Sequence, residues 1–233
     1  MVDQPLLVTE LSRFARMLVT DYPVSDALHD FVDAAAAVLG VHGAGISLAK
    51  DDRLAFATAT PEDIRVLEEV QEADQVGPCT EAYRARRAVL VADLATRSGD
   101  WPDLVTAAGR MGIAAVGSVP LLLDAHCLGT LDLYQTHVHE WTDDERSVAG
   151  LFAAFAAGYL VNSSRLRDVR ETADQLQEAL DSRVIIEQAK GVLAGERGVS
   201  VDEAFRDLRA HARSRGAALR DVASAVVNLG LRP

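Results

Sequence analysis

Residues 114–135 read AAVGSVPLLLDAHCLGTLDLYQ, and this stretch carries the strongest β-hairpin pattern in the chain. Two runs rich in strand-forming residues flank the turn sequence Asp124-Ala125-His126. A second pair of short apolar runs lies upstream, at residues 43–50 (GAGISLAK) and 53–60 (RLAFATAT), and a further short strand is expected at residues 88–93 (AVLVAD). Runs of this kind predict an antiparallel sheet.

Patterns of helical spacing surround the predicted strands. The expected helices cover residues 10–19 (ELSRFARMLV), 25–40 (SDALHDFVDAAAAVLG) and 61–71 (PEDIRVLEEVQ). Residues 77–87 (GPCTEAYRARR) are expected to form a turn followed by a short helix, and GDWPD at residues 99–103 is expected to be a loop. Ser25 is the expected N-cap of the second helix, and Gly40 is its expected stop. A sheet with helices before it and between its strands predicts the α+β class.

The chain is predicted to be helical from Trp141 to its end. Thr142 and Glu145 have the spacing of a capping box at the start of a long apolar-periodic run. Farther along, apolar residues recur every three or four positions, as in a coiled-coil stripe; they are Leu166, Val169, Ala173, Leu176, Leu180 and Val184. This stripe either faces a second copy of the chain or packs on the chain's own domain. We expect a homodimer, because a helix leaving a domain has little else to pack on.

The C-terminal segment is predicted to form three short helices. The first is expected to end near Ala194, where GERG (195–198) interrupts the pattern. Ser200 and Glu203 make a second capping box for the next helix, which is expected to end at Gly216. The third helix is expected at residues 219–229 (LRDVASAVVNL).

Charge is distributed unevenly along the chain. The net charge of −12 argues against nucleic-acid binding by the protein surface as a whole. Residues 1–164 carry 11 Lys and Arg against 24 Asp and Glu, whereas residues 165–233 carry 12 against 11. This asymmetry indicates two functional units, of which the second is locally basic.

One face of the predicted helix after Ser200 is basic. Arg206, Arg209 and Arg213 fall within roughly 60° of one another at about 100° per residue, although Asp202 lies on the same face. A guanidinium group stays charged and offers a planar fork of donors that suits phosphate. The alternative is a solvated face with pairs such as Asp202–Arg206, and charge spacing alone does not decide between the two.

The sequence does not support a secreted, membrane-spanning, metal-binding or enzymatic protein. Residues 1–23 contain acidic residues and no basic region leading into an apolar run, so they are not a signal peptide. GLFAAFAAGYLV at 150–161 is too short to span a membrane and is expected to be a buried helix face, which predicts no membrane contact. Two cysteines do not suggest a disulfide framework or a zinc site, so a reducing cytoplasm is expected. HVHE at 137–140 is expected to be a solvated loop, and no metal site, phosphate-binding loop or catalytic constellation is recognised; we predict no enzyme activity.

The C-terminal helices resemble an ANTAR domain, the three-helix RNA-binding module of bacterial transcription antitermination regulators. The resemblance covers roughly residues 180–229 and rests on Arg183, Ile186, Ala189-Lys190-Gly191 and Leu193, on Ala204, Phe205, Leu208-Arg209 and Ala212, and on Leu219 and Asp221-Val222-Ala223. Ala194 departs from the pattern, because the family often has a larger apolar residue there. The resemblance implies binding to paired RNA stem-loops, usually by a dimer, so that a terminator hairpin fails to form.

The same resemblance implies the RNA-contacting residues. Lys190, Arg209 and Arg183 stand at positions of the family's motif, although Arg183 could instead pair with Glu187. Arg213 and Arg220 are added from the basic pattern of this sequence. The periodicity places Phe205, the aromatic residue of this segment, in the core, so recognition is expected to rely on charge, hydrogen bonds and loop shape.

Residues 24–161 are similar to a GAF domain, a sensory fold that binds small molecules or dimerises. The resemblance rests on GPCTEAYRARRAVLVADL (77–94), the Trp101-Pro102 loop, the hairpin segment at 112–135 and WTDDERSVAGLFAAFAAGYL (141–160). It implies a small-molecule ligand whose identity the sequence does not give. Cys79, at the start of a short helix, and Trp101 are the sensor candidates, with structural packing as the alternative for both.

Three segments follow from these expectations: a GAF sensory domain with an N-terminal helix at residues 1–161, a coiled-coil-like helical linker at 162–181 and an ANTAR RNA-binding module at 182–233. The predicted function is a cytoplasmic antitermination regulator, in which a signal at the GAF domain controls RNA binding. The alternatives are a constitutively dimeric protein-interaction scaffold and a DNA-binding regulator resembling a helix-turn-helix protein.

Overall fold

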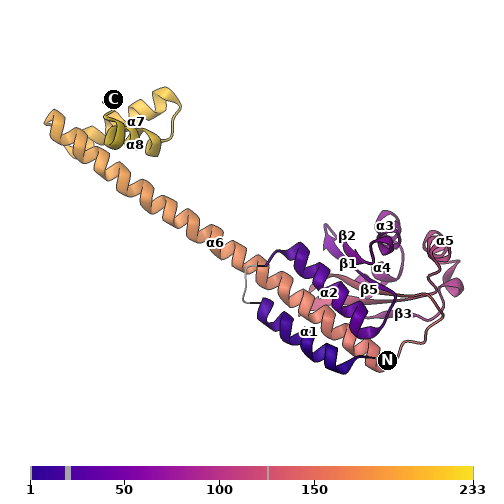
Figure 1. Ribbon diagram of the computed structural model, residues 1–233. Helices are drawn as coiled ribbons and strands as arrows, with labels where there is room; N and C mark the ends of the chain where they lie inside the picture. The colour runs from indigo at the N-terminus through magenta and orange to yellow at the C-terminus, as the bar shows by residue number, and fades with distance from the viewer. Residues whose placement is uncertain (1, 19–21, 125, 233) are drawn as a thin grey trace. The chain divides into compact units, whose positions relative to one another are not determined.

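The computed structural model describes residues 2–18, 22–124 and 126–232, with the side chains of 167–181 and 183 outside the described set. The chain divides into two compact units, Met1–Ser164 and Arg165–Pro233. The first contains a sheet with helices, and the described part of the second consists of helices joined by short turns (Figure 1). The predicted α+β class is therefore confirmed.

A five-stranded antiparallel sheet lies at the centre of the first unit. Its order is β2 (Arg53–Thr60), β1 (Gly43–Lys50), β5 (His126–Gln135), β4 (Ala115–Leu123) and β3 (Val89–Val91). The hairpin predicted from residues 114–135 is the β4–β5 pair, in which Ser118 lies opposite Asp132 and Val119 opposite Leu131. Because β5 also pairs with β1, this strand is the centre of the sheet.

Three helices cover one face of the sheet: α1 (Gln4–Met17), α2 (Val24–Leu39) and the first part of α6 (Asp143–Arg197) (Figure 1). Alternate strand residues such as Ile46, Leu131 and Leu133 pack with these helices in a single apolar core. Aromatic side chains join the helices within it, as in the contact between Phe14 and Phe31, whose ring centroids are 4.1 Å apart.

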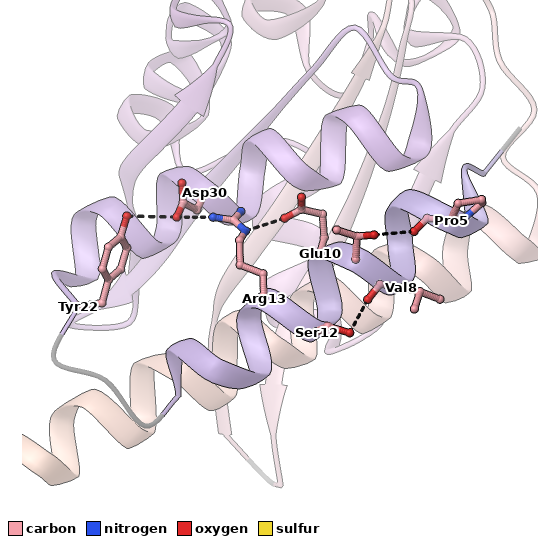
Figure 2. Close-up of polar contacts among 8 residues, drawn as sticks. Pro5, Val8, Glu10, Ser12, Arg13, Tyr22 and Asp30 are labelled. Atoms are coloured by element: carbon pink, nitrogen blue, oxygen red, sulfur yellow. Dashed lines mark hydrogen bonds and ion pairs between the residues drawn. The ribbon is translucent and has the colours of Figure 1, made fainter.

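Polar contacts join α1 and α2 at the edge of this core (Figure 2). Arg13 lies 2.8 Å from both Glu10 and Asp30, and the Tyr22 hydroxyl donates to Asp30 over 3.2 Å. The Arg13 guanidinium also lies 4.7 Å from the centroid of the Phe14 ring. Such partly exposed pairs contribute little stability compared with the aromatic core beneath them, but they set how α1 lies on α2.

The second face of the sheet is covered by short elements: η1 (Glu62–Ile64), α3 (Arg65–Asp74), α4 (Pro78–Ala85), η2 (Leu94–Arg97) and α5 (Pro102–Met111). A separate apolar cluster, including Leu67, Leu94 and Leu104, lies among them. The loop predicted at 99–103 is correct only in its first half, because α5 begins at Pro102. The fixed φ of proline and its missing N–H suit that first helical position.

Helix ends differ from the sequence expectations at several points. The first helix begins at Gln4 rather than residue 10, because the Asp3 side chain caps it by accepting from the Leu6 N–H over 3.0 Å. Ser25 lies inside α2, whose N-cap is Pro23, so the predicted cap is wrong. Gly40 is confirmed as the stop, with a left-handed φ of 63° that favours glycine.

The start of α6 behaves as a core helix. The capping box is confirmed, since the Glu145 N–H donates to Thr142 Oγ1 and the Thr142 N–H to Glu145 Oε2. By length and composition alone, Asp143–Leu166 could cross a membrane. This segment is longer than residues 150–161, which were judged too short from the sequence. Several of its apolar side chains, including Phe152, are buried in the core against the sheet.

The second unit consists of the last part of α6, α7 (Val201–Arg215) and α8 (Leu219–Leu229). Its core joins all three helices through Ala189, Leu193, Ala204, Leu208, Ala212, Val222, Ala223 and Val226. The Ser200–Glu203 capping box and the stop at Gly216 are confirmed. The first helix ends at Arg197 rather than Ala194, because Gly195 is accommodated within it and Gly198 takes the left-handed φ.

The predicted coiled-coil stripe lies mostly outside the described side chains. Of its six residues, only Leu166 and Val184 are described, and both are exposed. Homodimer formation through this stripe therefore stays a prediction.

Candidate functional sites

The predicted basic face of α7 is present in the second unit. Arg206, Arg209 and Arg213 are all exposed. Arg206 and Arg213 line an open hollow of about 570 Å³, together with Glu203 and Asp207. Arg206 lies 3.7 Å from Glu203, and this pair takes the place of the Asp202–Arg206 pair considered from the sequence.

Phe205 lies next to this face rather than inside the core. Its side chain is half-buried and does not belong to the buried cluster, so its predicted core position is only partly correct. The Lys190 ammonium lies 4.9 Å from the ring centroid and the Arg209 guanidinium 5.6 Å from it. The ring therefore brings a cation from α6 and a cation from α7 to one place.

Lys190 is the less accessible of these two cations. Its side chain is 14% exposed, and its ammonium lies 2.8 Å from a carboxylate oxygen of Glu187. Arg209 is exposed, and its backbone carbonyl accepts a hydrogen bond from Arg213 Nε over 3.3 Å. Arg209 is therefore better placed than Lys190 to reach a ligand in solution.

The structure says less about the other two predicted RNA contacts. Arg220 is exposed in the first turn of α8. The side chain of Arg183 lies outside the described set. The described residues thus bring Lys190 and Arg209 together over Phe205, and Arg213 is joined to Arg209 through the Arg209 carbonyl.

A buried polar cluster fills part of the space between the sheet and α3–α4 in the first unit. Tyr134 donates from its hydroxyl to Glu68 Oε1 over 3.0 Å, and Ser47 donates to Glu68 Oε2 over 3.0 Å. Gln71 Nε2 donates to the Tyr134 hydroxyl over 3.1 Å. Thr130, on the same sheet face, donates to Asp132 Oδ2 over 2.9 Å. All of these side chains are buried.

A glycine makes room for the Glu68 carboxylate against the sheet. Gly45 lies opposite Asp132 in the β1–β5 pair. A Cβ at Gly45 would come within 2.0 Å of Glu68 Oε1, so any side chain there would displace the carboxylate. This cluster was not predicted from the sequence. The available signal was polar residues alternating with leucine in GTLDLYQ (129–135), together with Glu68 and Gln71 one turn apart on α3.

Burial shifts the titration of the cluster. It raises the pKa of Glu68, and the nearby charge of Asp132 raises it further. Burial also raises the pKa of Asp132 from 3.8 to about 7, against the opposing effect of the Ser118 and Thr130 hydroxyls. The cluster therefore holds protons at a pH where free carboxyl groups have lost them.

Cys79 lies at the edge of this cluster. It is 1% exposed, and its backbone N–H donates to Gln71 Oε1 over 3.2 Å. Burial raises the pKa of the Cys79 thiol, and the charges of Asp132 and Glu68 raise it further. These effects oppose the lowering of a thiol pKa by a helix N-terminus, so the environment of Cys79 is that of a packed side chain.

Trp101 lines two neighbouring hollows outside α4, with volumes of about 300 and 240 Å³. It is 2% exposed, its indole N–H donates to Glu81 over 3.1 Å, and the Arg97 guanidinium lies 3.9 Å from its ring centroid. The tryptophan is thus both a packed residue and part of a pocket wall, the two roles weighed from the sequence.

The HVHE segment shows a structural contact. His139 Nε2 lies 3.2 Å from Glu145 Oε2, next to the capping box of α6. Across the residues that the structure describes, no group of three or more His, Cys, Asp or Glu side chains could hold a metal ion. Cys79 and Cys127 are both free thiols.

Comparison with known families matches both units. Residues 23–160 match the family model described as GAF domain, and residues 174–227 match the one described as ANTAR domain. A search of curated proteins found no match.

Solved structures resemble the first unit in fold. The GAF domain of a phosphoenolpyruvate-protein phosphotransferase from Coxiella burnetii has a TM-score of 0.55 at 14% identity, covering 70% of this chain and 98% of its own. Free methionine-R-sulfoxide reductase from Neisseria meningitidis has a TM-score of 0.54 at 16% identity, covering 71% and 96%. The corresponding phosphotransferase domain from Acinetobacter has a TM-score of 0.52 at 12% identity, covering 70% and 97%. At these identities the likeness concerns the fold alone.

The buried cluster predicts an unusual pH dependence for the first unit. A carboxyl group with a raised pKa binds a proton more tightly in the folded state, so stability is full below the unfolded pKa and is lost as pH rises through the folded pKa. For Asp132 this window runs from about pH 4 to about pH 7. The free energy of unfolding of this unit, measured by denaturant titration, should therefore fall across the window.

The variant Asp132→Asn should show a shallower decline than the parent protein. Asp124→Asn is the matched control, because Asp124 lies exposed in the turn of the same hairpin, and it should behave as the parent. Glu68, whose pKa burial also raises, faces the same cluster and keeps a residual slope in both variants. An unchanged slope in Asp132→Asn would contradict the assignment.

Proposed function

Because the chain belongs to the GAF domain family and carries an ANTAR domain at residues 174–227, we propose that it is an RNA-binding transcription antitermination regulator controlled by a signal at the GAF domain. Its RNA target is a pair of stem-loops, as the family resemblance implies, and it works as a homodimer in the cytoplasm. RNA binding keeps a terminator hairpin from forming, and the polymerase reads through.

The observation that carries this proposal is the group formed by Lys190, Phe205 and Arg209. Two cations from different helices lie over one aromatic ring, in a chain whose first unit is strongly acidic. Lys190 is paired with Glu187, whereas Arg209 is exposed, so Arg209 is the cation of this group that an anionic ligand can reach from solution. RNA loops present phosphates and splayed bases that charged side chains on a helix can reach.

Phe205 gives this surface a second property. A half-buried ring restricts the cationic side chains that lie over it, and thus lowers the entropy they lose when they bind. It also places an aromatic edge beside the basic residues, where an unstacked base could pack. The surface therefore combines charge with an aromatic group, whereas the helical periodicity had predicted Phe205 to lie in the core.

Arg213 and Arg206 extend the basic surface along α7. Arg213 is tied to Arg209 through its hydrogen bond to the Arg209 carbonyl, and both Arg206 and Arg213 border the α7 hollow. Glu203 and Asp207 in the same wall limit the local positive charge. We therefore assign Arg209 the principal contact with RNA, and Arg206 and Arg213 a supporting electrostatic role.

RNA binding can be separated from the alternative functions by one experiment. The full-length protein is mixed with a tandem stem-loop RNA or with duplex DNA of equal length, and mobility shifts are recorded over a salt series. We expect RNA to bind at micromolar protein or below, with affinity falling steeply as salt rises, because phosphate contacts release counterions. Preference for the duplex DNA would favour a DNA-binding regulator, and absence of salt-sensitive binding to either would favour a protein-interaction scaffold.

Arg209→Gln should weaken RNA binding by roughly tenfold and lower the salt slope by about one, because one phosphate contact is lost. Arg53→Gln is the matched control: it makes the same charge change at an exposed position of β2, in the acidic unit. This control should bind RNA as the parent does. An equal loss in both variants would mean that net charge, not the α7 surface, determines affinity.

Phe205→Leu should lower RNA affinity about threefold, as expected for losing a cation–π contact at a partly exposed site. Phe205→Tyr keeps the ring and should retain parental affinity. Circular dichroism of both variants checks that the helices persist. Parental affinity in Phe205→Leu would show that the ring has no part in holding Lys190 and Arg209 for RNA.

A further inference from the structure

A hollow of about 240 Å³ opens at the surface of the first unit, where the end of α3 meets the start of α5. The two helices lie side by side on the outer side of the domain (Figure 1). The hollow has apolar walls and an acidic rim, which include Val76, Trp101 and Pro102, and Asp74, Asp100 and Asp103 respectively. We call it the α3–α5 hollow. It is separate from the buried polar cluster, since Glu68 and Asp132 are not among the described residues that line it.

Exposed apolar side chains continue the α3–α5 hollow along α3. Val76, which lines the hollow, is 44% exposed, and Val66 is 49% exposed. Helical spacing places Val66, Val70 and Ala73 on one side of α3, and this α3 stripe leads to Val76. Val70 is half-buried against the second apolar cluster. Single exposed valines are ordinary, but a contiguous apolar surface beside a hollow marks an interaction site.

The end of α3 directs negative potential at the hollow. The helix ends at Asp74, and its last turn contains no basic residue. The C-terminus of a helix carries a partial negative charge, so an acidic residue is unfavourable there and a cation is stabilising. Glu72, in the same turn, already accepts a hydrogen bond from the Phe56 N–H over 3.0 Å. Asp74 is thus the acidic group of this helix end that a cation from outside can reach.

The cations beside the hollow do not neutralise Asp74. Arg97 lies 2.7 Å from Asp100 and 3.1 Å from Glu81, so it is shared between two other carboxylates. Asp74 and Asp103 are exposed, and neither forms an ion pair within the described part of the chain. Asp103 lies in the first turn of α5, where the helix dipole favours an acidic residue. Only Asp74 lacks a favourable partner within the fold described.

The walls and rim of the α3–α5 hollow select the chemistry of its occupant. Lysine and arginine combine an apolar stem with a cationic head, so the stem can lie on Val76 and Pro102 while the head faces Asp74. The aspartates would repel an anionic group, and a wholly apolar side chain would remove Asp74 from water without a partner. Across the described residues, no group of three or more acidic, Cys or His side chains could hold a metal ion. A basic side chain meets all of these conditions.

We propose that the α3–α5 hollow and the α3 stripe form a docking surface for a basic amphipathic helix of a partner protein. One Lys or Arg side chain of that helix occupies the hollow, and its apolar side chains pack on Val66 and Val70, as in helix-in-groove recognition. The surface lies in the first unit and does not use the α7 residues assigned to RNA. The inference therefore goes beyond RNA binding: it gives the GAF domain a protein partner.

The test measures calorimetric binding of a synthetic amphipathic helical peptide of leucine and lysine to the full-length protein. One control peptide has glutamine in place of lysine, and the other has serine in place of leucine. Both should bind at least about tenfold more weakly, because the surface requires charge and apolar contact together. No binding of the leucine–lysine peptide, or equal binding of either control peptide, would overturn the proposal.

The variant Val76→Ser locates the apolar contact without changing charge. It should weaken binding of the leucine–lysine peptide about fivefold, because part of the apolar wall is lost. Val138→Ser is the matched control: Val138 is 58% exposed in the same unit and does not line the hollow, so it should bind as the parent. Parental affinity in Val76→Ser would refute the assigned surface. A dimer in the peptide-free parent that dissociates in Val76→Ser would make the occupant a second copy and would equally refute the stated partner.

The variant Asp74→Asn locates the charge contact. It should weaken peptide binding about tenfold, because the head of the basic side chain loses its carboxylate. Its ligand-free stability should not fall, since the substitution removes a negative charge from a helix C-terminus. Asp51→Asn makes the same charge change in the exposed β1–β2 turn, at a positive φ that asparagine tolerates, and should bind as the parent. Equal losses in the two variants would show non-specific attraction to an acidic domain and would overturn the docking site.

Discussion

The central strand β5 serves two opposite environments at once. Because side chains alternate along a strand, Leu131 and Leu133 enter the apolar core under α1, α2 and α6, whereas Asp132 and Tyr134 face α3 and α4. A shift of one residue in the pairing of β5 would exchange the two sets and place a carboxyl group in the apolar core. The β4–β5 register is therefore the constraint on which both the stability of the GAF fold and the chemistry of its interior depend.

The two units use electrostatics in opposite ways. In the first unit, Glu68 and Asp132 lie in a low-dielectric interior, where burial raises the pKa of both carboxyl groups. In the second, charge is displayed: Arg209 and its neighbours lie on an exposed helix face, where salt screens them. The acidic surface of the first unit repels nucleic acid, which confines binding to the short basic segment.

Much of this organisation follows from the sequence, for identifiable reasons. Capping boxes at Thr142 and Ser200 are local devices, and their spacing predicts the helix starts well. The composition of Trp101-Pro102 predicts a loop, but α5 begins there because Pro102 suits the first helical position and Trp101 packs in the second apolar cluster. The interior cluster was missed because polar residues alternating with leucine in β5 are typical of a sheet with one solvated face, whereas α3 and α4 cover that face here. Phe205 has the spacing of a core residue, but it stands at the edge of the apolar face beside Arg209.

Because Cys79 is buried, the rate at which its thiol is modified reports on local opening of the GAF domain. Alkylating reagents attack the thiolate, and Cys79 is both buried and, because its pKa is raised, disfavoured in that form. The rate at which Cys79 becomes modified therefore counts the openings of α4, while the half-buried Cys127 in the same fold supplies an internal reference. Thiol alkylation can therefore measure, without any added label, how often the interior beside Cys79 becomes exposed to solvent.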